Sequence, residues 1–233
     1  MSSKKVQHHL YKNKPSIDLV QKSIQAAKKL SGRELDEIKL IAVSKKIEPN
    51  KILEIIKLGQ KDFGENRVQE ALSKWPNIQK KFPHIKLHLI GPLQTNKVRD
   101  AVSIFDTIHS LDRLKLAEVL AKEFKKTNRR IKCFVQVNIG EETQKSGVLP
   151  AETDEFVEFC IRECKIPIIG LMCIPPANED PAPFFAFLNE IARRNSLHDL
   201  SMGMSRDFET AISLGATQIR VGSAIFGPRN DMR

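Results

Sequence analysis

Short apolar segments alternate along the chain with longer amphipathic ones. The short segments are rich in β-branched residues and bounded by Gly, Pro, Asn or Asp, which is typical of strands. They predict about eight strands, at 39–45, 62–66, 86–91, 107–111, 132–139, 167–174, 199–204 and 218–226. The longer segments have helical periodicity, with apolar residues on one face and charged residues on the other. Clear examples are 50–58 and 113–126, and a further helix at 17–30 precedes the first strand.

Several predicted strands are almost continuously apolar, which favours parallel strands covered by helices. About eight strand–helix units in 233 residues come close to the ~250 residues typical of a (β/α)₈ barrel. We therefore predict an α/β fold, a single TIM barrel. A doubly wound open sheet is the alternative, but no Gly-x-Gly-x-x-Gly follows the first strand. Because little chain follows the last strand, the helix at 17–30 should complete the helical ring.

Pro and Gly are scattered along the chain and form no linker, so we expect one domain over residues 1–233. The net charge of +10 favours anionic partners such as phosphates. The first residues do not resemble a signal or transit peptide, and no apolar run is long enough to span a membrane. The four cysteines form no Cys-x-x-Cys pair and have no histidine at metal-ligand spacing. These features indicate reduced core cysteines, no metal site and a cytoplasmic protein.

In a barrel of this kind, functional side chains gather where strands end. Lys45 closes the first predicted strand, where partial desolvation and nearby cations can lower a lysine pKa enough for imine chemistry. A solvated lysine is the alternative. Asn66 and Asn96 follow the second and third strands, where they could also be helix caps or turn residues.

The ends of the last two strands carry small and hydroxyl residues. Barrels commonly bind phosphate there through backbone N–H groups, and Ser205, Gly222 and Ser223 are placed to do so. Gly203 is better explained by tight packing. A lysine after the first strand combined with a phosphate site after the last two suits a phosphorylated aldehyde held as a Schiff base.

Seven motifs, in order over most of the chain, resemble the pyridoxal phosphate homeostasis proteins (YggS/PROSC family). They are 42–45 (AVSK), 63–70 (FGENRVQE), 88–97 (HLIGPLQTNK), 145–147 (KSG), 170–172 (GLM), 201–205 (SMGMS) and 220–227 (RVGSAIFG). The resemblance implies a barrel like the N-terminal domain of alanine racemase. It also implies binding of pyridoxal 5′-phosphate (PLP) and a role in vitamin B6 homeostasis, without established catalysis.

The resemblance further implies a set of cofactor-binding residues: Lys45, Asn66, Asn96, Ser205, Arg220, Gly222 and Ser223. Lys45 would form the covalent internal aldimine, Ser205, Gly222 and Ser223 would hold the phosphate, and Arg220 would face the pyridine nitrogen. The two asparagines would lie near the cofactor. PLP-dependent apo-enzymes are the partners that a carrier role implies.

The residues themselves favour binding over turnover. An arginine is already a donor, so at the pyridine nitrogen it disfavours the protonation that makes PLP a strong electron sink. A racemase also needs a second acid/base, commonly a tyrosine, and the only tyrosine is Tyr11. His88 and His109 are other candidate bases, although a packed histidine on a strand is commoner. We expect no separate C-terminal domain to supply that group.

Two other function classes remain open. A weak PLP-dependent racemase would exchange the α-proton of an amino acid with deuterated water. A nucleic-acid-binding protein would use the positive charge, but the basic clusters lack interleaved aromatic residues, which make up only 6% of the chain. We expect a monomer that binds neither nucleic acid nor a membrane.

Overall fold

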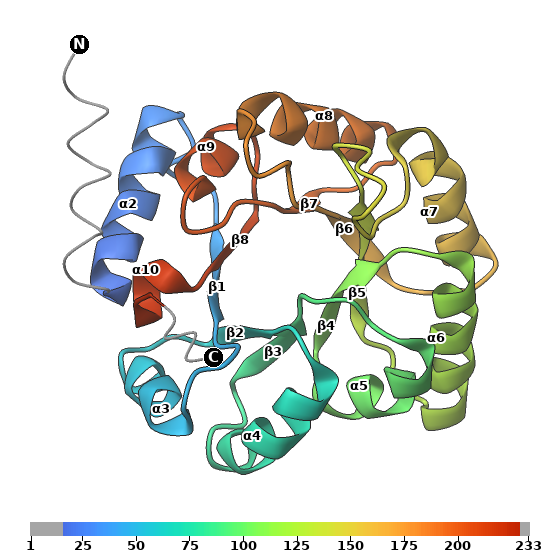
Figure 1. Cartoon of the computed structure of the whole chain (residues 1–233), viewed down its shortest axis with the longest axis horizontal. Helices are drawn as coiled ribbons and strands as arrows, with labels where there is room; N and C mark the ends of the chain where they lie inside the picture. Colours follow the sequence, from blue (N-terminus) through green and yellow to red (C-terminus); the bar gives the residue numbers. More distant parts are fainter. Residues whose placement is uncertain (1–15, 229–233) are drawn as a thin grey trace.

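The strands of the computed structural model, which describes residues 16–228, close into a barrel (Figure 1). Each strand pairs in parallel with the next, and β8 closes the barrel against β1, with Lys39 opposite Gln218 and Ala42 opposite Val221. The strands are β1 (Lys39–Val43), β2 (Asp62–Glu65), β3 (Lys86–Leu89), β4 (Thr107–Leu111), β5 (Lys132–Val137), β6 (Ile168–Cys173), β7 (Asp199–Ser201) and β8 (Gln218–Val221). The predicted α/β barrel of the alanine racemase N-terminal type is confirmed, and the open sheet is excluded.

Helices form a ring around the strands (Figure 1). They are α2 (Ile17–Leu30), α3 (Pro49–Lys57), α4 (Val68–Lys81), α5 (Val98–Ile104), α6 (Leu114–Thr127), α7 (Thr153–Arg162), α8 (Pro181–Arg194), α9 (Phe208–Ser213) and α10 (Ser223–Phe226), with 3₁₀ turns η1 (Thr95–Lys97) and η2 (Pro150–Glu152). Local signals define some helix starts. Pro181 stands in the first turn of α8, and the Asp180 carboxylate accepts a hydrogen bond of 3.0 Å from Ala182 N.

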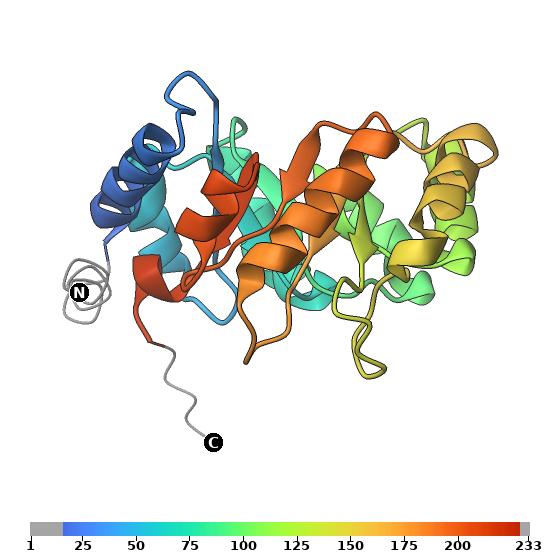
Figure 2. The ribbon, with the colours of Figure 1, turned by 90° about the horizontal axis from the view of Figure 1, so that it is seen from above.

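The leading helix α2 packs against α9 and α10, beside the strands that close the barrel (Figures 1 and 2). Val20 is fully buried, and Ser16 N donates a 3.0 Å hydrogen bond to the carbonyl of Ala224. The helix after β8, α10, has only four residues, and α2 packs against it in the place of a longer eighth helix. This confirms that the leading helix completes the ring.

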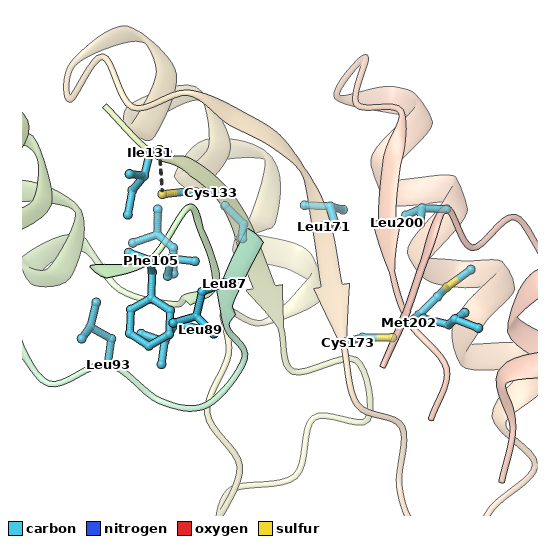
Figure 3. Packing of buried hydrophobic residues seen from close by; sticks show 14 of the residues in the cluster. Leu87, Leu89, Leu93, Phe105, Ile131, Cys133, Leu171, Cys173, Leu200 and Met202 are labelled. Carbon is cyan, nitrogen blue, oxygen red and sulfur yellow. Dashed lines mark hydrogen bonds between the residues drawn. The ribbon is translucent and has the colours of Figure 1, made fainter. Parts of the chain in front are cut away.

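The core lies between the strands and the surrounding helices. Leu87, Leu171 and Leu200 come from different strands and are buried (Figure 3). The same close-up shows Cys133 and Cys173 among apolar neighbours. All four cysteines are free thiols, and burial raises the pKa of Cys173 to about 12. Such thiols stay protonated, as expected of core residues.

The predicted strands begin almost where the structure has them, but several end too late. The eighth was wrong beyond Val221, because the chain leaves the sheet at Gly222 and residues 223–226 form α10. The first ends at Val43 and not at Lys45. The apolar residues of these strands continue into the loops at the barrel end. Their side chains still pack there, but their backbone no longer pairs with a neighbouring strand.

Residues 16–228 contain no helix with the length and apolar character to cross a bilayer. They also contain no group of three or more His, Cys, Asp or Glu side chains that could hold a metal ion. Tyr11 lies outside the described residues.

Candidate functional site

The residues predicted to bind a ligand follow strands that all run in one direction, so they gather at the carboxyl end of the barrel. Arg220 and Gly222 are buried, and Ser223 and Asn96 are exposed. The remaining three, Lys45, Asn66 and Ser205, are half-buried. Arg220 lies within β8, whereas the others lie in the loops and first turns beyond the strands.

Lys45 lies in a tight turn just after β1, so the prediction that it ends the strand was wrong by two residues. Ile47 N donates to the carbonyl of Ser44 at 3.0 Å, which closes the turn. Lys46 has φ +60°, a left-handed conformation uncommon for a lysine. The Lys74 ammonium donates to the Ser44 carbonyl at 2.8 Å, and Glu70 Oε1 accepts from Lys46 N at 2.5 Å. Helix α4 therefore holds the turn that carries Lys45.

Glu65, at the end of β2, is fully buried beneath this turn. Its Oε1 accepts hydrogen bonds from Ser44 Oγ at 2.7 Å and Trp75 Nε1 at 3.0 Å, and lies 2.8 Å from Lys74 Nζ. Its Oε2 has no hydrogen-bond partner. Burial raises the pKa of Glu65, although Lys74, Ser44 and Trp75 oppose the shift. Neither Glu65 nor Lys74 was predicted as a site residue; a carboxylate inside an apolar strand is the signal that could have indicated Glu65.

The loops after β7 and β8 are joined to each other. Gly222 N donates to Ser205 Oγ at 3.3 Å, and Arg220 N donates to the Gly203 carbonyl at 2.9 Å. A Cβ on Gly222 would lie 3.3 Å from both the carbonyl oxygen and Cβ of Val43, tighter than most real contacts. Two of the predicted phosphate-binding residues are therefore in contact, and they lie close to the end of β1, which precedes Lys45.

The Arg220 side chain points from β8 into the interior of the barrel. Its Nη1 donates to Ser201 Oγ at 2.7 Å and its Nη2 to the Cys173 carbonyl at 2.8 Å. Burial lowers the pKa of Arg220, and Cys173 and Asp207 act in the opposite direction. A guanidinium has five N–H donors, so these two hydrogen bonds leave further donors to the group.

The two asparagines differ in their settings. A Cβ on Gly91 would lie 2.3 Å from the Asn66 carbonyl oxygen, so only glycine allows the β3 exit to approach Asn66 so closely. Asn96 lies in η1, and its side chain is exposed.

The family model of the alanine racemase N-terminal domain matches residues 16–230. A pyridoxal phosphate homeostasis protein of Aquifex aeolicus (strain VF5) is 40% identical over 222 residues, covering 91% of this chain and 96% of that protein. The chain belongs to the pyridoxal phosphate homeostasis protein family. The pyridoxal phosphate homeostasis protein of Escherichia coli (strain K12) is 37% identical over 220 residues, covering 91% of this chain and 94% of that protein.

Among solved structures, PipY of Synechococcus elongatus PCC7942 with PLP bound is 36% identical, with a TM-score of 0.74. The match covers 86% of this chain and 99% of PipY. The resemblance to pyridoxal phosphate homeostasis proteins is thus confirmed over nearly the whole length of its relatives. The seven site residues remain predictions.

Proposed function

We propose that this chain binds PLP reversibly and serves in PLP homeostasis, by buffering the cofactor and passing it to apo-enzymes. The observation that carries the proposal is the grouping at one barrel end of the Lys45 turn, the Arg220 guanidinium and the Ser205–Gly222 contact. The PLP-bound structure of PipY, a relative at 36% identity, supports the same ligand.

The donor set fits a phosphorylated ligand. A phosphate at neutral pH accepts hydrogen bonds, and Ser205 and Ser223 each offer a hydroxyl. The N–H groups of Ser223 and Ala224 open α10 and have no acceptor within the helix, whereas those of Ile225 and Phe226 donate to the Gly222 carbonyl. Gly222 has no side chain to obstruct an approaching anion. We propose that these groups hold the phosphate, and that Asn66 and Asn96 contact the ligand nearer the opening.

When bound, PLP supplies an aldehyde that bonds to amines and a pyridine ring that withdraws electrons. We propose that Lys45 Nζ is the amine that attaches covalently to it. The Ser44–Ile47 turn, held by Lys74, would keep that amine near the Ser205–Gly222 contact. Arg220 would donate a hydrogen bond to the pyridine nitrogen and, as a cation, keep that nitrogen unprotonated.

This arrangement favours binding without catalysis. Weak electron withdrawal by an unprotonated ring slows carbanion formation, so we propose a carrier and not an enzyme. We further propose that the chain is one PLP-binding domain over 1–233, acts in the cytoplasm and is monomeric. Amino acids incubated with the PLP-loaded protein in deuterated water should show no α-deuteration above the rate with free PLP; faster exchange would contradict the carrier role.

The phosphate assignment is tested by comparing two ligands. Apo-protein is titrated with PLP and with pyridoxal, which lacks the phosphate, using the wild type and the Ser205→Ala/Ser223→Ala variant. Loss of two hydroxyl donors to a charged acceptor, at about 1.5 kcal/mol or more each, should weaken PLP binding about a hundredfold or more. Pyridoxal binding should stay unchanged. Equal weakening of both ligands, or of neither, would overturn the assignment.

A further inference from the structure

A chain of hydrogen bonds crosses the interior of the barrel from the amino end to Arg220. Asp62 Oδ1 lies 2.9 Å from His88 Nε2, and His88 Nδ1 lies 3.0 Å from His109 Nε2. His109 Nδ1 lies 2.8 Å from Ser201 Oγ, which accepts from Arg220 Nη1 at 2.7 Å. His109 is on β4 and Ser201 on β7, which are not neighbours, so this contact spans the barrel interior (Figure 1).

The members of this interior chain are held rigidly. His109 and Ser201 are completely buried, and His88 and Arg220 are no more than 4% exposed. The ring of Phe134 stacks on His109 with centroids 4.4 Å apart. Only the Asp62 end meets solvent, at a hollow of about 680 Å³ at the amino end of the barrel.

With both imidazoles neutral, the ionised Asp62 carboxylate determines the direction of the hydrogen bonds. Arg220 can only donate, and an ionised Asp62 can only accept. Although burial opposes its ionisation, the hydrogen bond from His88 and the nearby Lys39 ammonium lower the pKa of Asp62. Ser201 accepts from Arg220 and keeps its own proton to donate.

Two neutral imidazoles then have one consistent assignment. His88 has its proton on Nε2 and donates it to Asp62, so His88 Nδ1 accepts from His109 Nε2. His109 Nδ1 in turn accepts from the Ser201 hydroxyl. Both rings are then Nε2–H tautomers. All donors point from Arg220 towards Asp62.

We propose that Asp62, His88, His109 and Ser201 are positioning residues that fix the Arg220 guanidinium for its ligand through this one-directional chain. The proposal rests on the proposed PLP function only for the identity of that ligand. A proton on His88 Nδ1 removes the acceptor of His109, which must then reverse its tautomer and leave the Ser201 hydroxyl proton without its acceptor.

Burial and nearby cations keep His109 neutral. Burial, followed by the neighbouring His88, Arg220 and Lys39, holds the pKa of His109 well below its ordinary value. Lys39 Nζ lies 3.4 Å from Asp62 at the amino end, and Cys173 and Asp207 are the groups facing Arg220 at the other end. Lys86 pairs with Asp106 at 3.3 Å beside the same hollow.

The tautomers can be measured without any ligand. Long-range ¹H–¹⁵N spectra of the labelled apo-protein near neutral pH, assigned with His88→Gln and His109→Gln, should show both rings as neutral Nε2–H tautomers. A charged His109, or its Nδ1–H tautomer, would overturn the proposal whether or not PLP binds.

The positioning role needs a readout at Arg220 itself. In the wild type, hindered rotation of the Arg220 guanidinium should keep the NMR signals of its Nη groups separate, and Ser201→Ala should average them. The same variant should weaken PLP binding about tenfold, the equivalent of one charged hydrogen bond. Asp62→Asn, which retains an acceptor, should keep the wild-type tautomers, whereas Asp62→Ala should give mixed tautomers. Asp106→Asn, at the same hollow but outside the interior chain, is the control. Unchanged Arg220 signals in Ser201→Ala would refute the role even if PLP affinity fell.

Discussion

Glu65 and Lys74 form a buried ion pair beneath the Lys45 turn, with 0% and 7% of their side chains exposed. Lys74→Met leaves a buried carboxylate without its cation, and removing one partner of such a pair costs about 3–5 kcal/mol. We expect that loss in the free energy of urea unfolding. The Glu65→Gln/Lys74→Met variant should recover part of it, because no unpaired charge remains. Equal losses in the single and double variants would show that the charges are not coupled.

The pH dependence of the same carboxyl has a definite sign. Burial raises the pKa of Glu65 above its ordinary value of 4.5, so the folded state binds its proton more tightly than the unfolded state. Its contribution to stability is therefore greatest below pH 4.5 and declines as the pH rises through the folded pKa. As the pH rises from acid to neutral, the free energy of unfolding of the wild type should fall relative to that of Glu65→Gln. A difference that is constant with pH would contradict the raised pKa.

Gly203 shows a separate packing constraint near Ser205. It has φ +92°, and a Cβ there would lie 2.6 Å from Ala211 Cβ and 2.9 Å from Phe208 Cα. Gly32 also has a positive φ, +67°, but nothing lies within 4 Å of its Cβ position. Gly203→Ala should therefore lower the thermal midpoint clearly more than Gly32→Ala, which carries only the backbone strain. Equal shifts would mean that the close approach is relieved at no cost.

The positions of Lys45, Ser205 and Gly222 beyond strand ends were predictable, because each follows an apolar strand. Their roles stay predictions. The role of Glu65 was not predictable, since it depends on a lysine one helix away, and neither was the His88–His109 contact between adjacent strands. Such pairs depend on strand register and inward orientation, which apolar runs alone do not determine.

At the scale of elements, α2 is the clearest case of a helix stabilised by packing. Ile24 is 5% exposed, whereas Leu30 at the end of the same helix is 87% exposed. Ile24→Ala should lower the free energy of unfolding by about 2–5 kcal/mol, and Leu30→Ala by less than about 0.5 kcal/mol. Chemical denaturation measures both. Similar small losses would mean that α2 adds little to the barrel.

Helix periodicity and strand starts were predicted well, and strand ends were not. The bounds of α2 agree with the predicted 17–30, because amphipathic spacing changes abruptly on both sides of it. Residues 223–226 were assigned to a strand because they continue the apolar run, and Ala224 and Ile225 are buried in the structure. The same side chains also suit a helix that packs on α2, and periodicity cannot separate the two over four residues.

For the whole molecule, the distribution of exposed apolar side chains bears on assembly. Within residues 16–228 the large exposed ones are Leu30, Leu35, Leu58, Leu114, Leu149, Ile161, Phe187 and Met204. They belong to different helices and loops around the ring, whereas a stable interface usually needs a contiguous apolar centre. Light scattering coupled to gel filtration should give the 26.4 kDa mass of a monomer. Twice that mass at micromolar concentration would contradict it.

Covalent attachment of PLP to Lys45 can be tested by finding the residue on which the bound cofactor is trapped. Protein mixed with PLP is reduced with borohydride, and the modified peptide is identified by mass spectrometry. Lys45→Ala removes the amine, and Lys46→Asn is the control, since asparagine tolerates the left-handed backbone there. The account predicts a visible absorption band and a pyridoxyl group on Lys45, both lost in Lys45→Ala and retained in Lys46→Asn. Absence of the band from the wild type, or a label that persists in Lys45→Ala, would contradict it.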